Sequence, residues 1–143
     1  SPPGGETAPT RVTEPVRSIV RTNIVLAGLV GGLGGEGCRA AAAHAINNGL
    51  TRVESARRWL HGETVGLGVL AQLHLEGKTG EADRLKRLFL RLGLPTRLRD
   101  VGVVPGSPTA HRVAAWACSP RETMRNMPRR ITRASLLRAL AAL

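Results

Sequence analysis

The chain has 143 residues, 42% of them hydrophobic and 22% charged, which fits one folded domain, excludes a disordered chain, and contains no run near the roughly 18 to 20 uninterrupted apolar residues of a spanning helix. Aromatic residues make up only 2%, which argues against a β-sandwich or barrel. The formal net charge is +11, and all but two of the 21 basic residues are arginine, so phosphate-rich partners are favoured, with a basic protein lacking any such partner as the alternative.

The N-terminal part predicts an extended tail followed by one apolar helix. Residues 1–12 are rich in Pro, Gly and Thr and have no core-forming pattern, so we expect a tail there. Thr13 can cap a helix that has Pro15 in its first turn, and a broad apolar face continues to Val30. A cluster of five glycines over 31–37 predicts that this helix ends there.

Two further helices are predicted in the middle of the chain. Residues 38–46 form an Ala-rich helix, which residues 47–49 (Asn-Asn-Gly) should end because these residue types tolerate left-handed backbone. After a loop to Trp59, residues 61–76 predict a mostly apolar helix. Glycines cost helix propensity, so we expect close backbone contacts at the three within it, which are Gly62, Gly66 and Gly68.

The segment that follows predicts an amphipathic helix and a capped helix. Residues 81–92 place leucines and a phenylalanine on one face and arginines on another, and Gly93 with Pro95 should end the helix. Ser107 followed by proline predicts the start of a helix that runs through Ala117.

The C-terminal segment completes an all-α prediction. Residues 119–122 (Ser-Pro-Arg-Glu) have the spacing of a capping box, and Thr132 caps a last helix that continues to the C-terminus. No alternating strand pattern of useful length occurs. We therefore expect a helical bundle formed by a single domain over residues 13–143, preceded by the tail 1–12.

Two of the four histidines lie in successive predicted helices. His44 falls within the helix 38–46 and His61 begins the helix 61–76, so the two helices could bring both imidazoles to one point. A catalytic zinc site needs three protein ligands. On spacing alone, the pair is more typical of ordinary histidines than of a metal site.

Four segments around these histidines occur in a specific order: GCRAAAAHAINNGL (37–50), WLHGETVGLGVLAQLHLEG (59–77), LFLRLGLPTRLRDVGV (88–103) and RNMPRRIT (125–132). In this order they closely resemble the C-terminal helical half of glycerol dehydrogenases, which belong to the iron-containing alcohol dehydrogenase superfamily. The two histidine-bearing helices and the Asn-Met-Pro turn make the resemblance specific, and it covers nearly the whole chain from about residue 11.

The resemblance implies that this chain matches the second part of a two-domain enzyme. In that family a nucleotide-binding α/β domain precedes an all-helical domain, and NAD and a divalent metal, usually zinc, lie between them. Matched residue by residue, His44 and His61 are the two histidine ligands. The aspartate ligand and the NAD-binding half precede the helices matched here, and the family's usual third histidine is Asn47 in this sequence. We therefore expect no cofactor in this chain alone, and zinc and NAD together with the other half.

Other candidate site residues have weaker support. Glu36 and Glu63 lie near the histidines in sequence and could replace the aspartate, although Glu63 also occurs in the family's His-Gly-Glu motif without that role. We expect His74 and His111 to be ordinary surface or partly buried imidazoles. Residues 126–128 (Asn-Met-Pro) resemble a family turn and are expected to be structural.

The arginines form clusters that could contact phosphate. A solvated helix face explains each cluster separately, but together with the absent enzyme half they favour contacts with an RNA backbone. Because aromatic stacking platforms are absent from the sequence, such contacts would depend on backbone and shape. The candidates are Arg57, Arg58, Arg84, Arg87, Arg91, Arg121, Arg125, Arg129, Arg130 and Arg133.

Two functions follow from these observations. The first is a non-catalytic, dehydrogenase-derived structural or accessory subunit of a large RNA-containing assembly such as a mitochondrial ribosome, with other protein chains and RNA as partners. The alternative is the metal-ligand half of an NAD-dependent, zinc-containing glycerol dehydrogenase, with the nucleotide-binding half and further copies of itself as partners. A stand-alone catalytic domain would need a cofactor site that these residues do not offer, and neither function involves membrane insertion.

The cysteines and the first residue bear on the compartment. Cys38 and Cys118 form no CxxC pair and are expected to be small buried thiols of a reducing, intracellular compartment. Because the chain begins with Ser1, we expect that an N-terminal piece has been removed. The assembly hypothesis then favours the mitochondrial matrix, and the enzyme hypothesis favours the cytoplasm.

Overall fold

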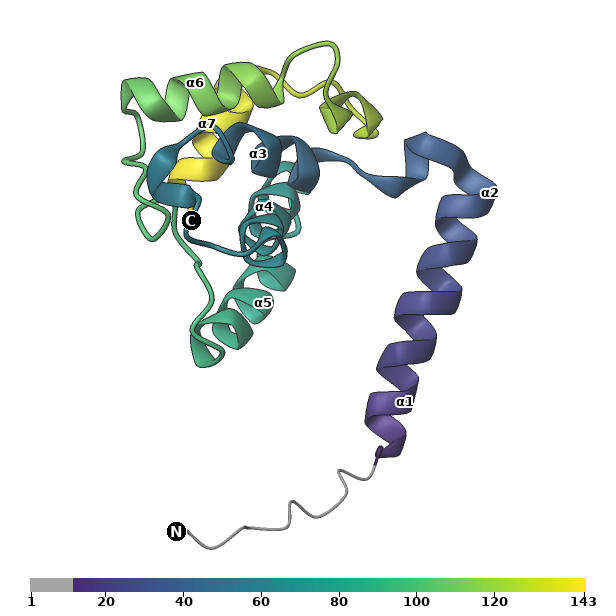
Figure 1. Ribbon diagram of the computed structural model, residues 1–143. Coiled ribbons are helices and arrows are strands. Elements are labelled where there is room, and N and C mark those ends of the chain that lie inside the picture. The colour runs from purple at the N-terminus through teal and green to yellow at the C-terminus, as the bar shows by residue number, and fades with distance from the viewer. Residues whose placement is uncertain (1–11) are drawn as a thin grey trace, which may run out of the picture. The chain divides into compact units, whose positions relative to one another are not determined.

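The computed structural model describes residues 12–143, except for the side chain of Glu36. These residues form helices and no strand, which confirms the predicted all-α fold (Figure 1). They divide into two compact units with the boundary between Arg39 and Ala40, whereas the sequence predicts one domain over 13–143. The predicted tail 1–12 lies outside the described residues apart from Val12.

The first unit is one long helical segment. Helix α1 (Glu14–Arg21) continues through the π-helical η1 (Thr22–Leu26) into α2 (Ala27–Arg39). The predicted end at Val30 is therefore wrong, because each glycine costs a helix only about 1 kcal/mol and does not by itself end it. The backbone leaves helical geometry at Gly35, whose φ of 60° lies in the left-handed region that glycine adopts readily.

This segment is long and apolar enough to cross a membrane by length and composition. It covers Glu14–Gly35, 22 residues with a mean hydropathy of 1.3, and none of that stretch is buried. Polar and basic residues interrupt this segment, so it contains no long uninterrupted apolar run and the sequence did not predict a spanning helix there. Signal sequences near an N-terminus satisfy the same criteria, so the absence of membrane insertion stays a prediction.

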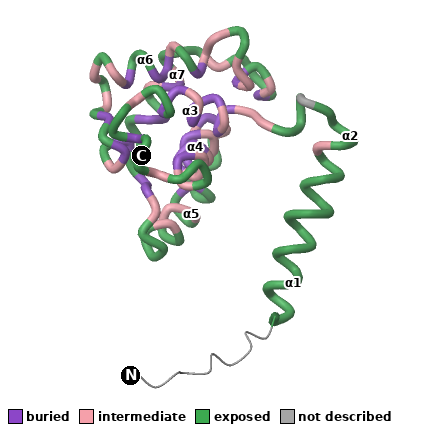
Figure 2. Tube along the Cα trace, in the orientation of Figure 1, coloured by how far each residue is buried: buried purple, intermediate pink, exposed green. Residues whose placement is uncertain are grey.

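The second unit, residues 40–143, contains the remaining helices. They are α3 (Ala42–Leu50), η2 (Glu54–Ala56), α4 (His61–Glu76), α5 (Thr79–Arg91), α6 (Pro108–Ala117), η3 (Thr123–Asn126) and α7 (Arg133–Ala141). Helix α3 packs against α4, α6 and η3, and α7 packs against both α4 and α6. Figure 2 shows burial concentrated on α3, α4 and the elements that cover them. Helix α3 is therefore the central element of this unit.

Small residues allow α3 to approach its neighbours closely. A Cβ atom on Gly68 of α4 would lie 2.5 Å from the Ala43 carbonyl oxygen, and one on Gly49 would lie 2.8 Å from that of Val113. The predicted helix end at 47–49 is wrong, since these residues lie inside α3 and are held there by this packing. The expected close backbone contact is confirmed at Gly68, whereas Gly66 faces the side chain of Phe89 and Gly62 faces open space.

Helix α5 has the predicted amphipathic pattern but only part of its apolar face is covered. Ala82 is buried against the bundle, whereas Leu88 and Leu92 are 40% and 63% exposed. Lys86 Nζ donates a hydrogen bond to the backbone oxygen of Leu143, which ties α5 to the C-terminus.

Helix caps are predicted correctly at two of three places in the C-terminal part. Ser107 Oγ accepts a hydrogen bond from the Ala110 N–H at 3.2 Å, and Thr132 Oγ1 accepts one from the Ser135 N–H at 3.1 Å. The predicted capping box at 119–122 does not form, because the Glu122 carboxylate accepts a hydrogen bond from Asn48 Nδ2 at 2.9 Å and only the short η3 follows.

The two cysteines differ in exposure. Cys38 is exposed, which corrects the expectation of a buried thiol, and Cys118 is partly buried. Burial raises the pKa of the Cys118 thiol, and the positive charge of Arg133 partly offsets this rise.

Candidate metal-ligand site

The packing of α3 on α4 brings the two predicted histidine ligands together. His44 lies in the first turn of α3 and His61 is the first residue of α4. Their ring centres are 6.0 Å apart and the ring planes are inclined at 53°. His44 is half-buried and His61 is exposed. Two histidines from different helices thus form one imidazole pair on the surface of the second unit.

The buried polar side chains of Asn47 and Thr64 form a hydrogen-bonded cluster with His61. Asn47 is 1% exposed and its Nδ2 lies 3.3 Å from His61 Nδ1. Thr64 Oγ1 donates to Asn47 Oδ1 at 2.6 Å. Sequence reasoning noted Asn47 only as a departure from the family pattern, although its position one turn after His44 on a helix places it on the same face. The pair is therefore part of a hydrogen-bonded cluster rather than two independent side chains.

The geometry of the pair fits a divalent metal. Bonds of about 2.0–2.1 Å and tetrahedral angles would place two imidazole centres about 5 Å apart. The observed separation of 6.0 Å is about 1 Å longer than this value. Asn47 Nδ2 lies against Nδ1 of His61, so Nε2 is the ring nitrogen that points away from Asn47.

A third ligand is not supplied by the described residues, which contain no group of three possible ligands. Glu63 is one of the two carboxylates that could replace the aspartate ligand. It accepts a hydrogen bond from the Leu60 N–H at 2.7 Å and so caps the N-terminus of α4. The side chain of Glu36 lies outside the described atoms. The pair therefore offers two of the three protein ligands that a catalytic zinc site uses.

A small pocket of about 260 Å³ adjoins His61. Asn47 and Thr64 form one side of it, and Arg57 and Trp59 also line it. The Trp59 Nε1–H is buried and has no hydrogen-bond acceptor among the described residues. Buried donors are normally satisfied by protein, water or ligand, so the Trp59 N–H is an exception among the described residues.

The ten predicted phosphate contacts are all exposed, but most do not converge. Arg84, Arg87 and Arg91 follow the outer face of α5. Arg58 donates to the Asp100 carbonyl oxygen at 3.2 Å, and Arg125 donates to that of Pro120 at 3.3 Å. The remaining candidates include Arg121 and Arg133, which lie near the C-terminal helices.

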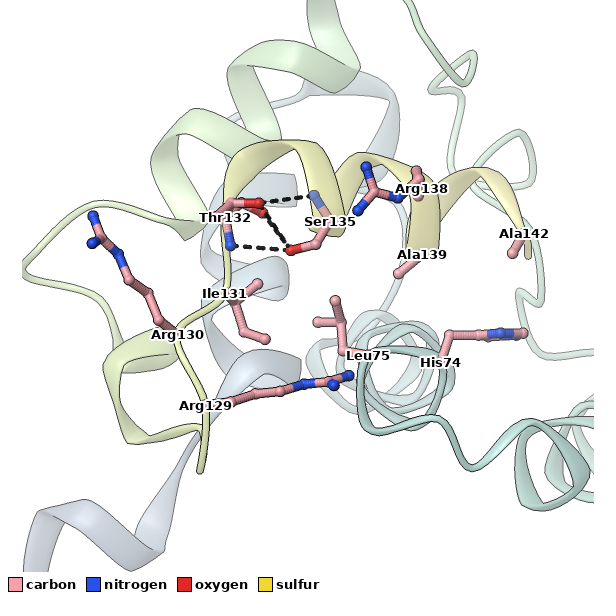
Figure 3. Close-up of a pocket in the computed structure, with 10 residues that line it drawn as sticks. All are labelled: His74, Leu75, Arg129, Arg130, Ile131, Thr132, Ser135, Arg138, Ala139 and Ala142. Carbon is pink, nitrogen blue, oxygen red and sulfur yellow. Dashed lines mark hydrogen bonds between the residues drawn. The ribbon is translucent and has the colours of Figure 1, made fainter.

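Two of the predicted arginines do share a pocket. Arg129 and Arg130 line a pocket of about 510 Å³ together with His74 and with Arg138, which sequence analysis missed. Figure 3 shows Arg129 reaching toward Leu75 of α4, while Arg130 points away from it. The spacing of Thr132, Ser135 and Arg138, one helical turn apart, could have indicated that Arg138 faces the same side of α7.

Glu76 directly follows Leu75 of this pocket in the chain, and its carboxylate is already bonded. Glu76 Oε2 lies 2.8 Å from Lys78 Nζ, and Gln72 Nε2 donates to its Oε1 at 2.9 Å. The hydrogen bond from Lys78 and then that from Gln72 lower the pKa of Glu76, and the charge of Arg129 contributes further. The pocket therefore presents net positive charge.

The other candidates occupy structural positions. Asn126 Nδ2 donates to the Ala40 carbonyl oxygen and Thr123 Oγ1 to that of Ala41, each at 2.8 Å. These bonds hold the start of α3 and support the structural interpretation of residues 126–128. His74 is half-buried beside the arginine pocket and His111 is exposed on α6.

Comparison with known proteins finds relatives that are longer than this chain. No protein-family model matches. The chain is 36% identical over 138 residues to an uncharacterised oxidoreductase of Synechocystis, covering 91% of this chain and 36% of that protein. It is 41% identical over 123 residues to a glycerol dehydrogenase of Pseudomonas putida, covering 85% and 33%. The chain thus spans about a third of the length of the curated relatives that it matches.

Its structure also matches a solved one. A probable glycerol dehydrogenase from Sinorhizobium meliloti superposes with a TM-score of 0.74 at 37% identity, covering 91% of this chain and 36% of that one. Identity at this level over nine-tenths of the chain indicates common descent as well as a common fold.

Proposed function

The chain is related to the C-terminal helical part of the glycerol dehydrogenases, and we propose from this relationship that it is the metal-ligand part of an NAD-dependent dehydrogenase. In this proposal His44 and His61 are two of the metal ligands. The observation that carries it is the 6.0 Å separation of their ring centres on two closely packed helices. A bound divalent metal would polarise the alcohol oxygen while NAD accepts the hydride.

In this proposal the residues of this chain position two of the metal ligands. Helices α3 and α4 carry the two imidazoles, and the close approach of Gly68 to the Ala43 backbone brings these helices together. Asn47 restrains the ring of His61 through its Nδ1. The third metal ligand and the NAD site would come from residues outside these 143, either in a longer polypeptide or in a separate chain.

The predicted role in an RNA-containing assembly gains no support from the relatives reported above, which are named as oxidoreductases. The alternative prediction, half of a glycerol dehydrogenase, is the better supported of the two. A cytoplasmic location and a partner carrying the nucleotide-binding half belong to the same proposal. Glycerol is the proposed substrate because it is named for two of the proteins compared.

Metal binding by the chain itself tests the first part of this proposal. Zinc binding to the purified chain would be measured by titration calorimetry for the unmodified protein and for the variants His44→Ala and His61→Ala. We expect each variant to lose more than about tenfold in affinity, since even supporting residues contribute 10- to 100-fold at such sites. His111→Ala, which removes an exposed histidine on α6, is the matched control and should bind as the unmodified chain does.

Activity tests the second part. The chain would be mixed with a polypeptide that carries the nucleotide-binding half of the Pseudomonas putida relative, and NAD reduction by glycerol would be followed. Activity that depends on both polypeptides and on His44 supports the proposal. Equal zinc affinity in the His44→Ala, His61→Ala and His111→Ala variants would refute the metal site.

A further inference from the structure

Asn47 connects the imidazole of His61 to the interior of the second unit. The residue is 1% exposed and Thr64 is 5% exposed, so neither side chain can satisfy its polar groups with bulk water. Asn47 Nδ2 lies 3.3 Å from His61 Nδ1, and Asn47 Oδ1 accepts from Thr64 Oγ1 at 2.6 Å. A buried amide bonded on both sides is held in a defined orientation.

The orientation of this amide determines which nitrogen of His61 carries the proton. In the arrangement described, Nδ2 donates to Nδ1, so Nδ1 is an acceptor and the proton of the neutral ring is on Nε2. A histidine that binds a metal through Nε2 must carry its proton on Nδ1 and donate it to an acceptor. The described arrangement therefore holds His61 in the tautomer that does not bind a metal through Nε2.

The cluster contains the groups needed for the opposite arrangement. If the amide turns over, Asn47 Oδ1 faces Nδ1 and accepts its proton, while Nδ2 donates to Thr64 Oγ1. The Thr64 hydroxyl then needs another acceptor, and the carbonyl oxygens of His61 and Leu60 lie 3.0 Å and 3.3 Å from it. In both arrangements Asn47 Oδ1, Asn47 Nδ2 and the Thr64 hydroxyl each have at least one hydrogen-bond partner, so the amide can turn over without leaving any of the three without a partner.

We propose that Asn47 is a positioning residue whose amide, supported by Thr64, sets the tautomer of His61 and thereby controls whether Nε2 is available to a metal. The link to metal rests on the proposed function. The coupling between amide orientation and imidazole tautomer does not, because it follows from the hydrogen bonds of the metal-free chain. Metal affinity is accordingly a property of α3 and its packing as well as of the ligands.

Nitrogen-15 NMR of the histidine rings tests the coupling without metal. In the unmodified chain at about pH 8, His61 is expected mainly as the Nε2–H tautomer. Asn47→Leu removes the amide, so the share of the Nδ1–H tautomer of His61 should rise toward that of a histidine ring without this hydrogen bond. Asn48→Leu is the matched control, because Asn48 is the next residue and bonds to Glu122 instead of His61, and it should leave the ratio unchanged.

Thr64→Val provides a second variant with little change of shape. It keeps the Asn47 amide next to His61 but leaves one amide group unpaired in either orientation, so we expect a tautomer ratio between those of the unmodified chain and Asn47→Leu. Circular dichroism shows whether each variant is folded. If Asn47→Leu does not fold, the tautomer ratio of His61 in Thr64→Val, measured by the same nitrogen-15 NMR experiment, tests the inference.

Zinc titration tests the consequence for the metal. Asn47→Leu should lower zinc affinity by about 10- to 100-fold, the range found for supporting residues of metal ligands, while Asn48→Leu should not. Adding zinc to the unmodified chain should convert His61 to the Nδ1–H form. An unchanged tautomer ratio in a folded Asn47→Leu or Thr64→Val variant overturns the inference. A changed ratio in a chain that does not bind zinc supports the coupling and refutes the proposed function instead.

Discussion

The contact between Gly68 of α4 and the backbone of α3 provides a sharp test of how the histidine pair is held. A Cβ atom at Gly68 would lie 2.5 Å from the Ala43 carbonyl oxygen and 2.9 Å from its Cα. Both atoms are backbone, so the helices must separate to admit a methyl group. Overpacking a core costs about 1–3 kcal/mol, and we place Gly68→Ala at the upper end because no side chain can move aside.

Two other glycines of α4 provide matched controls. Alanine gains up to about 1 kcal/mol over glycine in a helix, and at Gly62 this gain is unopposed because nothing lies within 4 Å of the new Cβ. At Gly66 the new Cβ would meet the Phe89 ring at 3.1 Å, and a side chain can shift. We therefore expect Gly62→Ala to stabilise slightly, Gly66→Ala to be near neutral, and Gly68→Ala to destabilise by about 2 kcal/mol net.

Urea unfolding followed by far-ultraviolet circular dichroism measures these free energies. The difference between Gly62→Ala and Gly68→Ala should be about 2–3 kcal/mol. The same Gly68→Ala variant should bind zinc more weakly than Gly66→Ala, because separation of α3 from α4 increases the distance between His44 and His61. Equal stabilities for the Gly62 and Gly68 variants would refute the argument that this contact fixes the site.

Three further predictions concern other parts of the chain. Cys38 should react with a thiol reagent before Cys118, because it is exposed and burial raises the pKa of the Cys118 thiol; mass spectrometry of the labelled peptides measures the order, and the reverse order would contradict it. Because folding lowers the pKa of Glu76, its charged carboxylate stabilises the folded chain at pH values above the ordinary pKa of 4.5, and this stabilisation is lost as the pH falls through the folded-state pKa. Glu76→Gln should therefore reduce the loss of unfolding free energy between neutral and acidic pH. Replacing Arg129 and Arg138 together by glutamine should weaken retention on a polyanion column more than a double glutamine variant on the outer face of α5, and equal retention would show that the pocket has no special role.

Local sequence signals predicted several elements of the second unit. The bounds 61–76 of α4 agree with the structure, since Gly77 follows in the left-handed conformation with a φ of 78°. Serine and threonine caps marked the starts of α6 and α7, because cap residues act on backbone groups only a few positions away. Such features depend on neighbours in the chain and can therefore be read from it.

Other features depend on residues distant in the chain, and only the tertiary structure decided them. Residues 47–49 are typical of a helix end, yet they continue α3 because Gly49 packs against Val113 and Asn47 is buried beside His61 and Thr64. Likewise, the two histidines are unremarkable by spacing, and their ring centres come within 6.0 Å only because α3 and α4 pack closely. The order of motifs determined the relationship to glycerol dehydrogenases, whereas long-range packing determined which side chains meet, because contact energies between helices outweigh local backbone preferences of about 1 kcal/mol.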